Sequence, residues 1–129
     1  MRYLFVFFLW LPLPALADTP LTAQEFDART VGKILFFGAE GQRYGVEEYL
    51  PDRRVRWSFL DGKCRDGVWY ENGPEICFLY EDNPEPQCWL FYTDGDGMRA
   101  EFATGNDPTI LYEVESGDEM LCLGPDVGV

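Results

Sequence analysis

The links between the apolar stretches of this chain constrain its fold most, because they are too short to connect parallel strands. From residue 31 onward, short runs of residues have the strand-like alternation of apolar and polar side chains. Links such as Asp61-Gly62 and Asn72-Gly73 favour tight hairpin turns, whereas a parallel crossover needs about a dozen residues or more. We therefore expect an all-β fold, an antiparallel meander of about eight strands that forms a small up-and-down β-barrel or a curled sheet. The predicted strands cover residues 31–37, 43–50, 54–60, 66–71, 75–81, 87–93, 98–103 and 109–115.

One short helix is predicted before the first strand. Thr22 and Glu25 have the spacing of a capping box, in which each side chain bonds to the backbone N–H of the other residue. Leu21 and Phe26 occupy the flanking positions of a hydrophobic staple. Gly32 is expected to stop the helix after about two turns.

The N-terminal residues 1–17, MRYLFVFFLWLPLPALA, have the pattern of a secretory signal peptide. A basic residue, Arg2, precedes a short apolar run, and Ala15-Leu16-Ala17 forms a small-x-small cleavage site. Cleavage after Ala17 leaves residues 18–129, which is 129 − 17 = 112 residues and enough for a single disulfide-stabilised β domain. We expect a periplasmic or secreted protein with no stable membrane insertion after cleavage.

The four cysteines all lie in the exported part of the chain, where an oxidising compartment favours two disulfides. If the loop at 83–86 is centred in its hairpin, the residue numbers of opposed pairs add up to 165, which places Cys77 opposite Cys88. Cys64 and Cys122 would then pair by elimination, although the sequence leaves other pairings open. Zinc would need closely spaced thiols or histidines, and the chain has no histidine. We expect no metal and no cofactor.

The charge of the exported chain limits its partners. Removing Arg2 leaves 10 − 1 = 9 basic side chains against 23 acidic ones, a net charge of −14. Such a charge repels nucleic acid and favours a cationic partner, either a protein or a small ligand of unknown identity.

Most catalytic mechanisms have no candidate residues here. Without histidine, the serine–histidine and cysteine–histidine mechanisms are absent, and no nucleophile motif surrounds either serine. Paired carboxylates leave an acid-only hydrolase open, but close pairs are expected by chance in so acidic a chain. The pairs are Glu47 with Glu48, Glu81 with Asp82, Asp94 with Asp96, and Glu113 with Glu115. We therefore predict no catalytic residue and no enzyme.

Two groups of residues are candidates for binding. Arg54 and Arg56 share one face of a predicted strand and form a possible binding surface, or an internal charge ladder with acidic neighbours. Trp57, Trp69 and Trp89 are possible lining residues of a cavity. A barrel of about eight strands is wide enough to be filled by side chains or to hold one small ligand.

Three motifs resemble those of a group of small secreted bacterial proteins of unknown function. They are Gly67-Val68-Trp69-Tyr70, Ile76-Cys77-Phe78-x-Tyr80 and Cys88-Trp89. The resemblance covers residues 31–93 and implies a bacterial, periplasmic setting without an established activity.

The sequence thus favours a non-catalytic binding or interaction protein. The alternative is a small-ligand carrier with an aromatic-lined cavity inside the barrel, and an acid-only hydrolase is less favoured. A cavity behind the tryptophans would support the carrier, whereas two carboxylates in one cleft would support the hydrolase.

Overall fold

The computed structural model describes residue 1 and residues 9–12, 18–106, 109–116 and 119–122. The expected signal peptide falls largely on residues 2–8 and 13–17, outside the described residues. No helix among the described residues has the length and apolar content needed to cross a bilayer.

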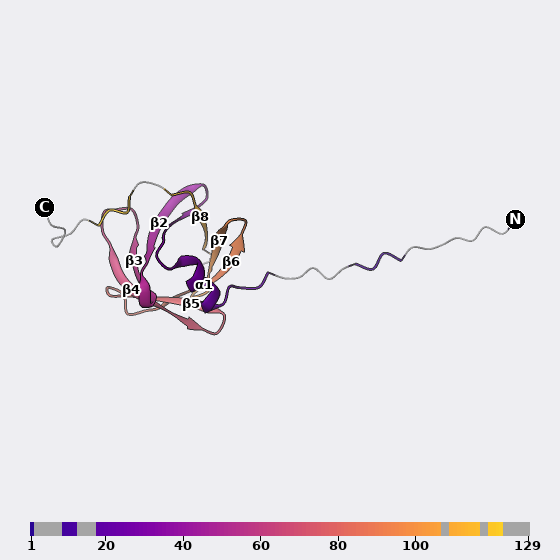
Figure 1. The fold of residues 1–129 in the computed structure, drawn as a ribbon, viewed down its shortest axis with the longest axis horizontal. Coiled ribbons are helices and arrows are strands. Elements are labelled where there is room, and N and C mark those ends of the chain that lie inside the picture. Colours follow the sequence, from indigo (N-terminus) through magenta and orange to yellow (C-terminus); the bar gives the residue numbers. More distant parts are fainter. Residues whose placement is uncertain (2–8, 13–17, 107–108, 117–118, 123–129) are drawn as a thin grey trace.

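The fold class is confirmed, and the sheet closes. One short helix, α1 (Ala23–Thr30), precedes eight antiparallel strands, each paired with its neighbours in sequence, and β1 pairs with β8 to complete a barrel. Figure 1 shows α1 within the ring of strands. The strands are β1 (Ile34–Ala39), β2 (Gln42–Tyr49), β3 (Arg54–Ser58), β4 (Arg65–Asn72), β5 (Glu75–Tyr80), β6 (Gln87–Asp94), β7 (Gly97–Phe102) and β8 (Ile110–Val114). A 3-10 turn, η1 (Pro51–Arg53), links β2 to β3.

The predicted capping box starts α1. The Glu25 N–H donates to Thr22 Oγ1, and the Thr22 N–H donates to Glu25 Oε1, each over 3.1 Å. These bonds satisfy backbone groups that a helix start otherwise leaves unpaired. They also lower the pKa of Glu25. Both staple residues, Leu21 and Phe26, are buried.

Phe26 closes one end of the barrel, which we call the helix end. Its side chain is completely buried. Its ring centroid lies 4.5 Å from that of Phe91, 5.1 Å from that of Trp69 and 5.6 Å from that of Tyr49. These rings come from β6, β4 and β2, so one side chain of the helix packs against three different strands of the barrel.

The cysteine pairing agrees with the sequence prediction. Cys77 of β5 lies directly opposite Cys88 of β6, and the two are joined in a disulfide with a Cα–Cα distance of 4.0 Å. Cys64 and Cys122 form the second disulfide, which ties the C-terminal segment to the connection between β3 and β4.

Every strand differs slightly from its predicted bounds, and two differ by more than one residue at an end. β1 begins at residue 34 rather than 31, because Val31 still caps α1 and Gly32 has a left-handed φ of 77°. β3 ends at Ser58 rather than at residue 60, and Leu60 has a φ of 67°. A positive φ takes the chain out of the extended conformation, so neither strand extends through such a residue.

Candidate functional site

A cavity of about 60 Å³ lies inside the barrel and reaches the surface at the end away from Phe26. Its deeper wall includes Tyr49, Phe78 and Phe91, whose rings also contact Phe26. Tyr44 and Phe59 line its outer part and are each 41% exposed. The cavity therefore begins at the surface and ends against Phe26, which we call the helix plug.

The opening is formed by four side chains that we call the mouth: Tyr44, Trp57, Phe59 and Arg65. The ring centroids of Tyr44 and Phe59 lie 5.7 Å apart, and those of Trp57 and Phe59 lie 5.4 Å apart. The Arg65 guanidinium lies over the Phe59 ring at 5.0 Å, and its Nε is 3.0 Å from Asp82 Oδ2. The mouth is thus aromatic, and its one cationic side chain already has an anionic partner.

Gly45 allows the Trp57 ring to occupy this position. The two residues lie on adjacent strands, and a Cβ at Gly45 would collide with the six-membered ring of Trp57. The same Cβ would lie 2.8 Å from the Ser58 carbonyl oxygen. A glycine is therefore required here for close packing, not for an unusual φ.

Glu47 of β2 places a carboxyl group in the wall of this cavity. Only 1% of the residue is exposed. The Tyr80 hydroxyl donates to Glu47 Oε1 over 2.9 Å. Glu47 Oε2 is buried and has no hydrogen-bond partner among the described residues. A buried carboxyl oxygen without a partner is costly, and native proteins contain few of them.

The apolar surroundings change the titration of this group. Burial raises the pKa of Glu47 well above its ordinary value, and the hydrogen bond from Tyr80 offsets part of the rise. Burial also raises the pKa of Tyr80 and of Tyr49, and the nearby Glu47 carboxyl adds to both effects. Glu47 therefore keeps its proton to a higher pH than an exposed glutamate does.

The predicted lining tryptophans lie in two different places. Trp57 and Trp89 line the cavity. Trp69 is buried at the helix end, where it packs against Phe26, and the Arg53 guanidinium lies over its ring at 4.4 Å. Trp69 is not among the described residues that line the cavity.

Arg54 and Arg56 lie on the outside of the barrel, away from the cavity. Arg56 stands between Glu48 on β2 and Asp66 on β4 in the strand register, and its Nε is 2.8 Å from Asp66 Oδ1. Arg54 Nε donates to the Pro51 carbonyl oxygen over 3.3 Å. The charge ladder is thus the arrangement that the structure shows for Arg56.

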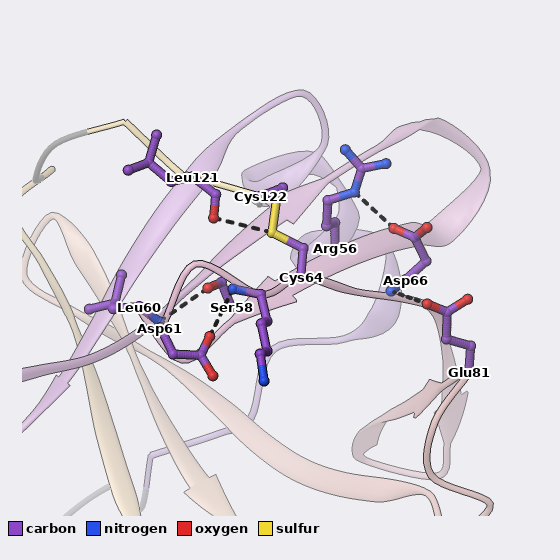
Figure 2. The surroundings of a disulfide bond; sticks show 10 residues. Arg56, Ser58, Leu60, Asp61, Cys64, Asp66, Glu81, Leu121 and Cys122 are labelled. Carbon is purple, nitrogen blue, oxygen red and sulfur yellow. Dashed lines mark hydrogen bonds and ion pairs between the residues drawn. A yellow bond between two sulfur atoms is a disulfide. The ribbon is translucent and has the colours of Figure 1, made fainter. Parts of the chain in front are cut away.

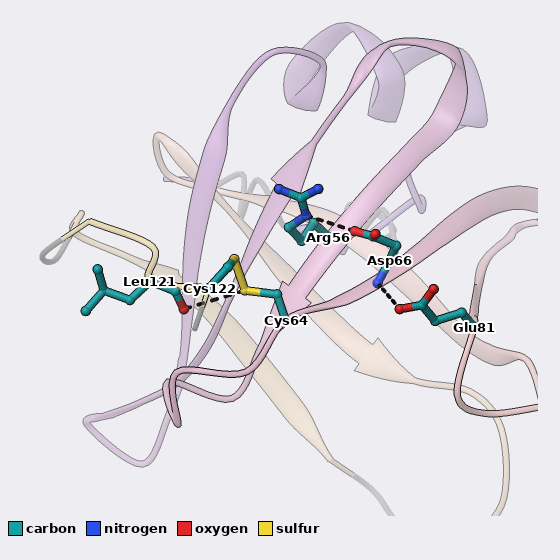
Figure 3. A network of polar contacts seen from close by, with 6 residues as sticks. All are labelled: Arg56, Cys64, Asp66, Glu81, Leu121 and Cys122. Carbon is teal, nitrogen blue, oxygen red and sulfur yellow. Dashed lines mark hydrogen bonds and ion pairs between the residues drawn. A yellow bond between two sulfur atoms is a disulfide. The ribbon is translucent and has the colours of Figure 1, made fainter. Parts of the chain in front are cut away.

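The second disulfide lies beside this ladder. Figure 2 shows Cys64 and Cys122 near Ser58 and Leu60, at the connection that follows β3. Figure 3 follows the polar chain from Arg56 to Asp66, whose backbone N–H donates to Glu81 Oε1 over 3.4 Å. These contacts are partly exposed, and exposed ion pairs contribute only about 0–1 kcal/mol.

None of the predicted carboxylate pairs meets in the barrel cavity. Glu47 faces the cavity, whereas its neighbour Glu48 lies in the outer ladder with Arg56. Among the described lining residues, Glu47 is the only carboxylate. A two-carboxylate mechanism needs a second acid or base that faces the same substrate. The described lining of this cavity provides Glu47 but no second carboxylate.

Two groups of residues have the acidic or sulfur ligands of a metal site, but each has a simpler explanation: the Asp94-Gly95-Asp96-Gly97 run, and Glu75 with Cys77 and Cys88. Asp94 and Gly97 pair at the end of the β6–β7 hairpin, and Gly95 has the left-handed φ of 57° that such a turn favours. Glu75 lies within ligand distance of the sulfurs of Cys77 and Cys88. Those sulfurs are joined in a disulfide, so neither is available as a thiolate ligand.

Glu47 was not predicted as a cavity residue, although the strand register carries a signal for it. Tyr49 pairs with Val55, and Glu47 pairs with Trp57, so opposed residues across this connection add up to 104. The same register argument that paired Cys77 with Cys88 would have placed Glu47 on the interior face, opposite Trp57.

Comparison of the chain with protein-family models, with curated proteins and with solved structures gave no match.

Proposed function

We propose that the chain is an exported, non-catalytic binding protein that holds a small ligand, or one end of a ligand, in the barrel cavity. The observation that carries this proposal is the buried, partly unpaired carboxyl of Glu47 in a cavity whose other walls are largely aromatic. Ligand sites have this composition, with apolar walls and a few polar groups that fix orientation.

The size of the cavity limits what can enter. A water molecule takes up about 30 Å³ in the liquid, so a volume of about 60 Å³ corresponds to about two of them. This is enough for a small polar head and the first carbon of a chain. A longer ligand would leave its remainder outside, in contact with the exposed rings of Tyr44 and Phe59.

A protein partner that inserts one side chain is the second candidate. Tyr44 and Phe59 are each 41% exposed and Leu60 is 45% exposed, which makes an apolar rim beside the opening. Aromatic residues are enriched where proteins meet, and one anchor side chain often fills a pocket. The same cavity would then receive the tip of that side chain. A periplasmic or secreted bacterial setting, as the signal peptide and the resemblance imply, belongs to either form of the proposal.

The three tryptophans of residues 18–129 provide the test. Trp57 and Trp89 line the cavity and Trp69 does not, so their indole N–H signals in a ¹⁵N-labelled sample report on the cavity and on a control position. A panel of small ligands is titrated into the protein, with n-butylammonium, 1-butanol and butyrate as its first members. Saturable shifts of the Trp57 and Trp89 signals without a matching shift of Trp69 are expected. Absence of any saturable shift across the panel would refute a small-ligand site.

A further inference from the structure

Glu47 offers a ligand one hydrogen-bonding position that the described protein atoms leave open. Tyr80 uses its hydroxyl hydrogen on Oε1, so Oε2 is the buried oxygen without a partner in a side chain that lines the cavity. As long as Glu47 is neutral, Oε2 is also the oxygen left to hold its proton. A ligand donor that replaces this proton would satisfy the carboxylate with a short, charge-assisted hydrogen bond.

The groups around Glu47 favour a cation in that position. Trp57 is its direct neighbour across β2 and β3, so a cation on Oε2 lies within reach of an indole ring. Tyr49 and Tyr80 flank the carboxyl, Glu113 contributes negative charge near Tyr49, and Gln87 is uncharged. Aromatic walls with one carboxylate are suited to an organic cation.

The cationic group nearest to this position does not offer a site for an anion. Arg65 is the only cationic side chain among the described lining residues. Its guanidinium lies on the Phe59 ring and is paired with Asp82. The net charge of −14 for residues 18–129 attracts cations and repels anions at long range.

We infer that the ligand is a slim organic cation, a primary ammonium on an unbranched carbon chain, whose ammonium group bonds to Glu47 Oε2 inside the barrel. This inference rests on the proposed function, because it names the ligand class for the same cavity. Primary ammonium suits the position, since its three donors can reach Oε2 and neighbouring oxygens while the chain lies against the aromatic walls.

Binding is accompanied by release of one proton from Glu47. Below the pKa of Glu47, the empty site holds a neutral carboxyl and the occupied site holds a carboxylate paired with the ammonium, so the carboxyl proton passes to solvent as the ligand enters. The ligand itself keeps its charge, as the lysine ammonium does below about pH 10. Affinity for the ammonium therefore rises with pH, by nearly tenfold per unit below the pKa of Glu47, and levels off above it.

The experiment compares three probes of equal chain length on the protein comprising residues 18–129. They are n-butylammonium, the neutral 1-butanol and the anionic butyrate, each followed by the Trp57 and Trp89 indole signals. Glu47→Gln is compared with Glu48→Gln, because both remove one carboxylate from adjacent positions and only the first faces the cavity. Glu47→Gln is expected to weaken n-butylammonium binding by roughly tenfold to a hundredfold, and Glu48→Gln by less than about threefold.

The outcomes separate this inference from the proposed function. If 1-butanol or butyrate binds wild type as tightly as n-butylammonium does, the cavity binds ligands but the ligand class is wrong. Equal losses in the two variants would mean that net charge, not Glu47, attracts the cation, and would also overturn the inference. If none of the probes shifts the cavity signals, the small-ligand function itself fails. Should Glu47→Gln not fold, the pH dependence of wild-type binding decides: a flat profile for n-butylammonium contradicts a role for the Glu47 carboxylate.

Discussion

Replacing Glu47 by glutamine should remove a pH-dependent cost from the folded state. In the folded protein, burial raises the pKa of Glu47 well above its ordinary value. In the unfolded chain the same carboxyl is exposed and titrates near pH 4.3. Between these two pKa values the folded protein holds a proton that the unfolded chain has released.

The sign of the effect follows from this difference. Because the folded state binds more protons, stability contributed by neutral Glu47 is fully present below the unfolded pKa and is lost as the pH rises toward the folded pKa. The loss is up to about 1.4 kcal/mol per pH unit, or up to about 2.7 kcal/mol between pH 5 and pH 7. A domain with a free energy of unfolding of about 5–15 kcal/mol would show such a change clearly.

Glutamine keeps the shape of the side chain and removes the titration. Its side-chain oxygen can still accept the hydrogen bond from Tyr80, whereas its NH₂ group is left buried at a cost of about 1–3 kcal/mol. That cost does not depend on pH. The stability difference between Glu47→Gln and wild type should therefore shift in favour of the variant as the pH rises from 5 to 7, whichever protein is more stable at pH 5.

Urea unfolding at pH 5, 6 and 7, with both disulfides intact, measures this difference. Glu48→Gln is the matched control, because Glu48 lies in the outer ladder and should leave the pH profile of wild type nearly unchanged. Parallel profiles for Glu47→Gln and wild type would refute the buried, neutral carboxyl. A profile of Glu48→Gln that matches that of Glu47→Gln would show that overall charge is responsible.

Three further substitutions test the parts of the barrel around the cavity by urea or thermal unfolding. Phe26→Ala should lower the free energy of unfolding by about 3–5 kcal/mol, because it empties the helix end; a loss below about 1 kcal/mol would contradict a plug. Gly45→Ala should cost about 1–3 kcal/mol and shift the Trp57 indole signal, because its Cβ collides with that ring; an unchanged signal would count against the close contact. Replacing Cys77 and Cys88 together by serine should cost about 3 kcal/mol, and wild-type stability in this double variant would show that the hairpin does not need the disulfide.

The features that sequence predicted well are those set by local chemistry. The capping box at Thr22 and Glu25 involves residues three positions apart, and both of its hydrogen bonds are present. The pairing of Cys77 with Cys88 needed only a centred loop and the strand register that follows from it. Such features depend on neighbours in the chain, so the sequence is enough to place them.

The cavity depends on contacts between distant parts of the chain, and the sequence alone did not distinguish its residues. The register of β2 and β3 separates Glu47 from Glu48, but nothing local separates Trp57 from Trp69, because each is an aromatic residue in a strand. Their difference arises when β1 pairs with β8 and Phe26 enters one end of the closed barrel. Trp69 then lies beside the plug, while Glu47 and Trp57 lie in the remaining space toward the mouth.

At Glu47, the buried carboxyl lowers the stability of the folded protein but provides a group that a ligand can bind. An apolar residue in its place would avoid the cost of burying Oε2, and the close packing of Phe26 shows that aromatic side chains can fill the helix end of this barrel. The fold instead keeps an acid at the cavity wall, held by Tyr80 and stabilised elsewhere by the helix plug and two disulfides. If an ammonium ligand satisfies the carboxylate, it removes this cost, and its stabilising effect should grow with pH over the range in which the empty protein loses stability. The ligand and the pH would then act on the same carboxyl group. Measuring ligand affinity and the pH dependence of stability in Glu47→Gln therefore distinguishes a binding site from a packing defect.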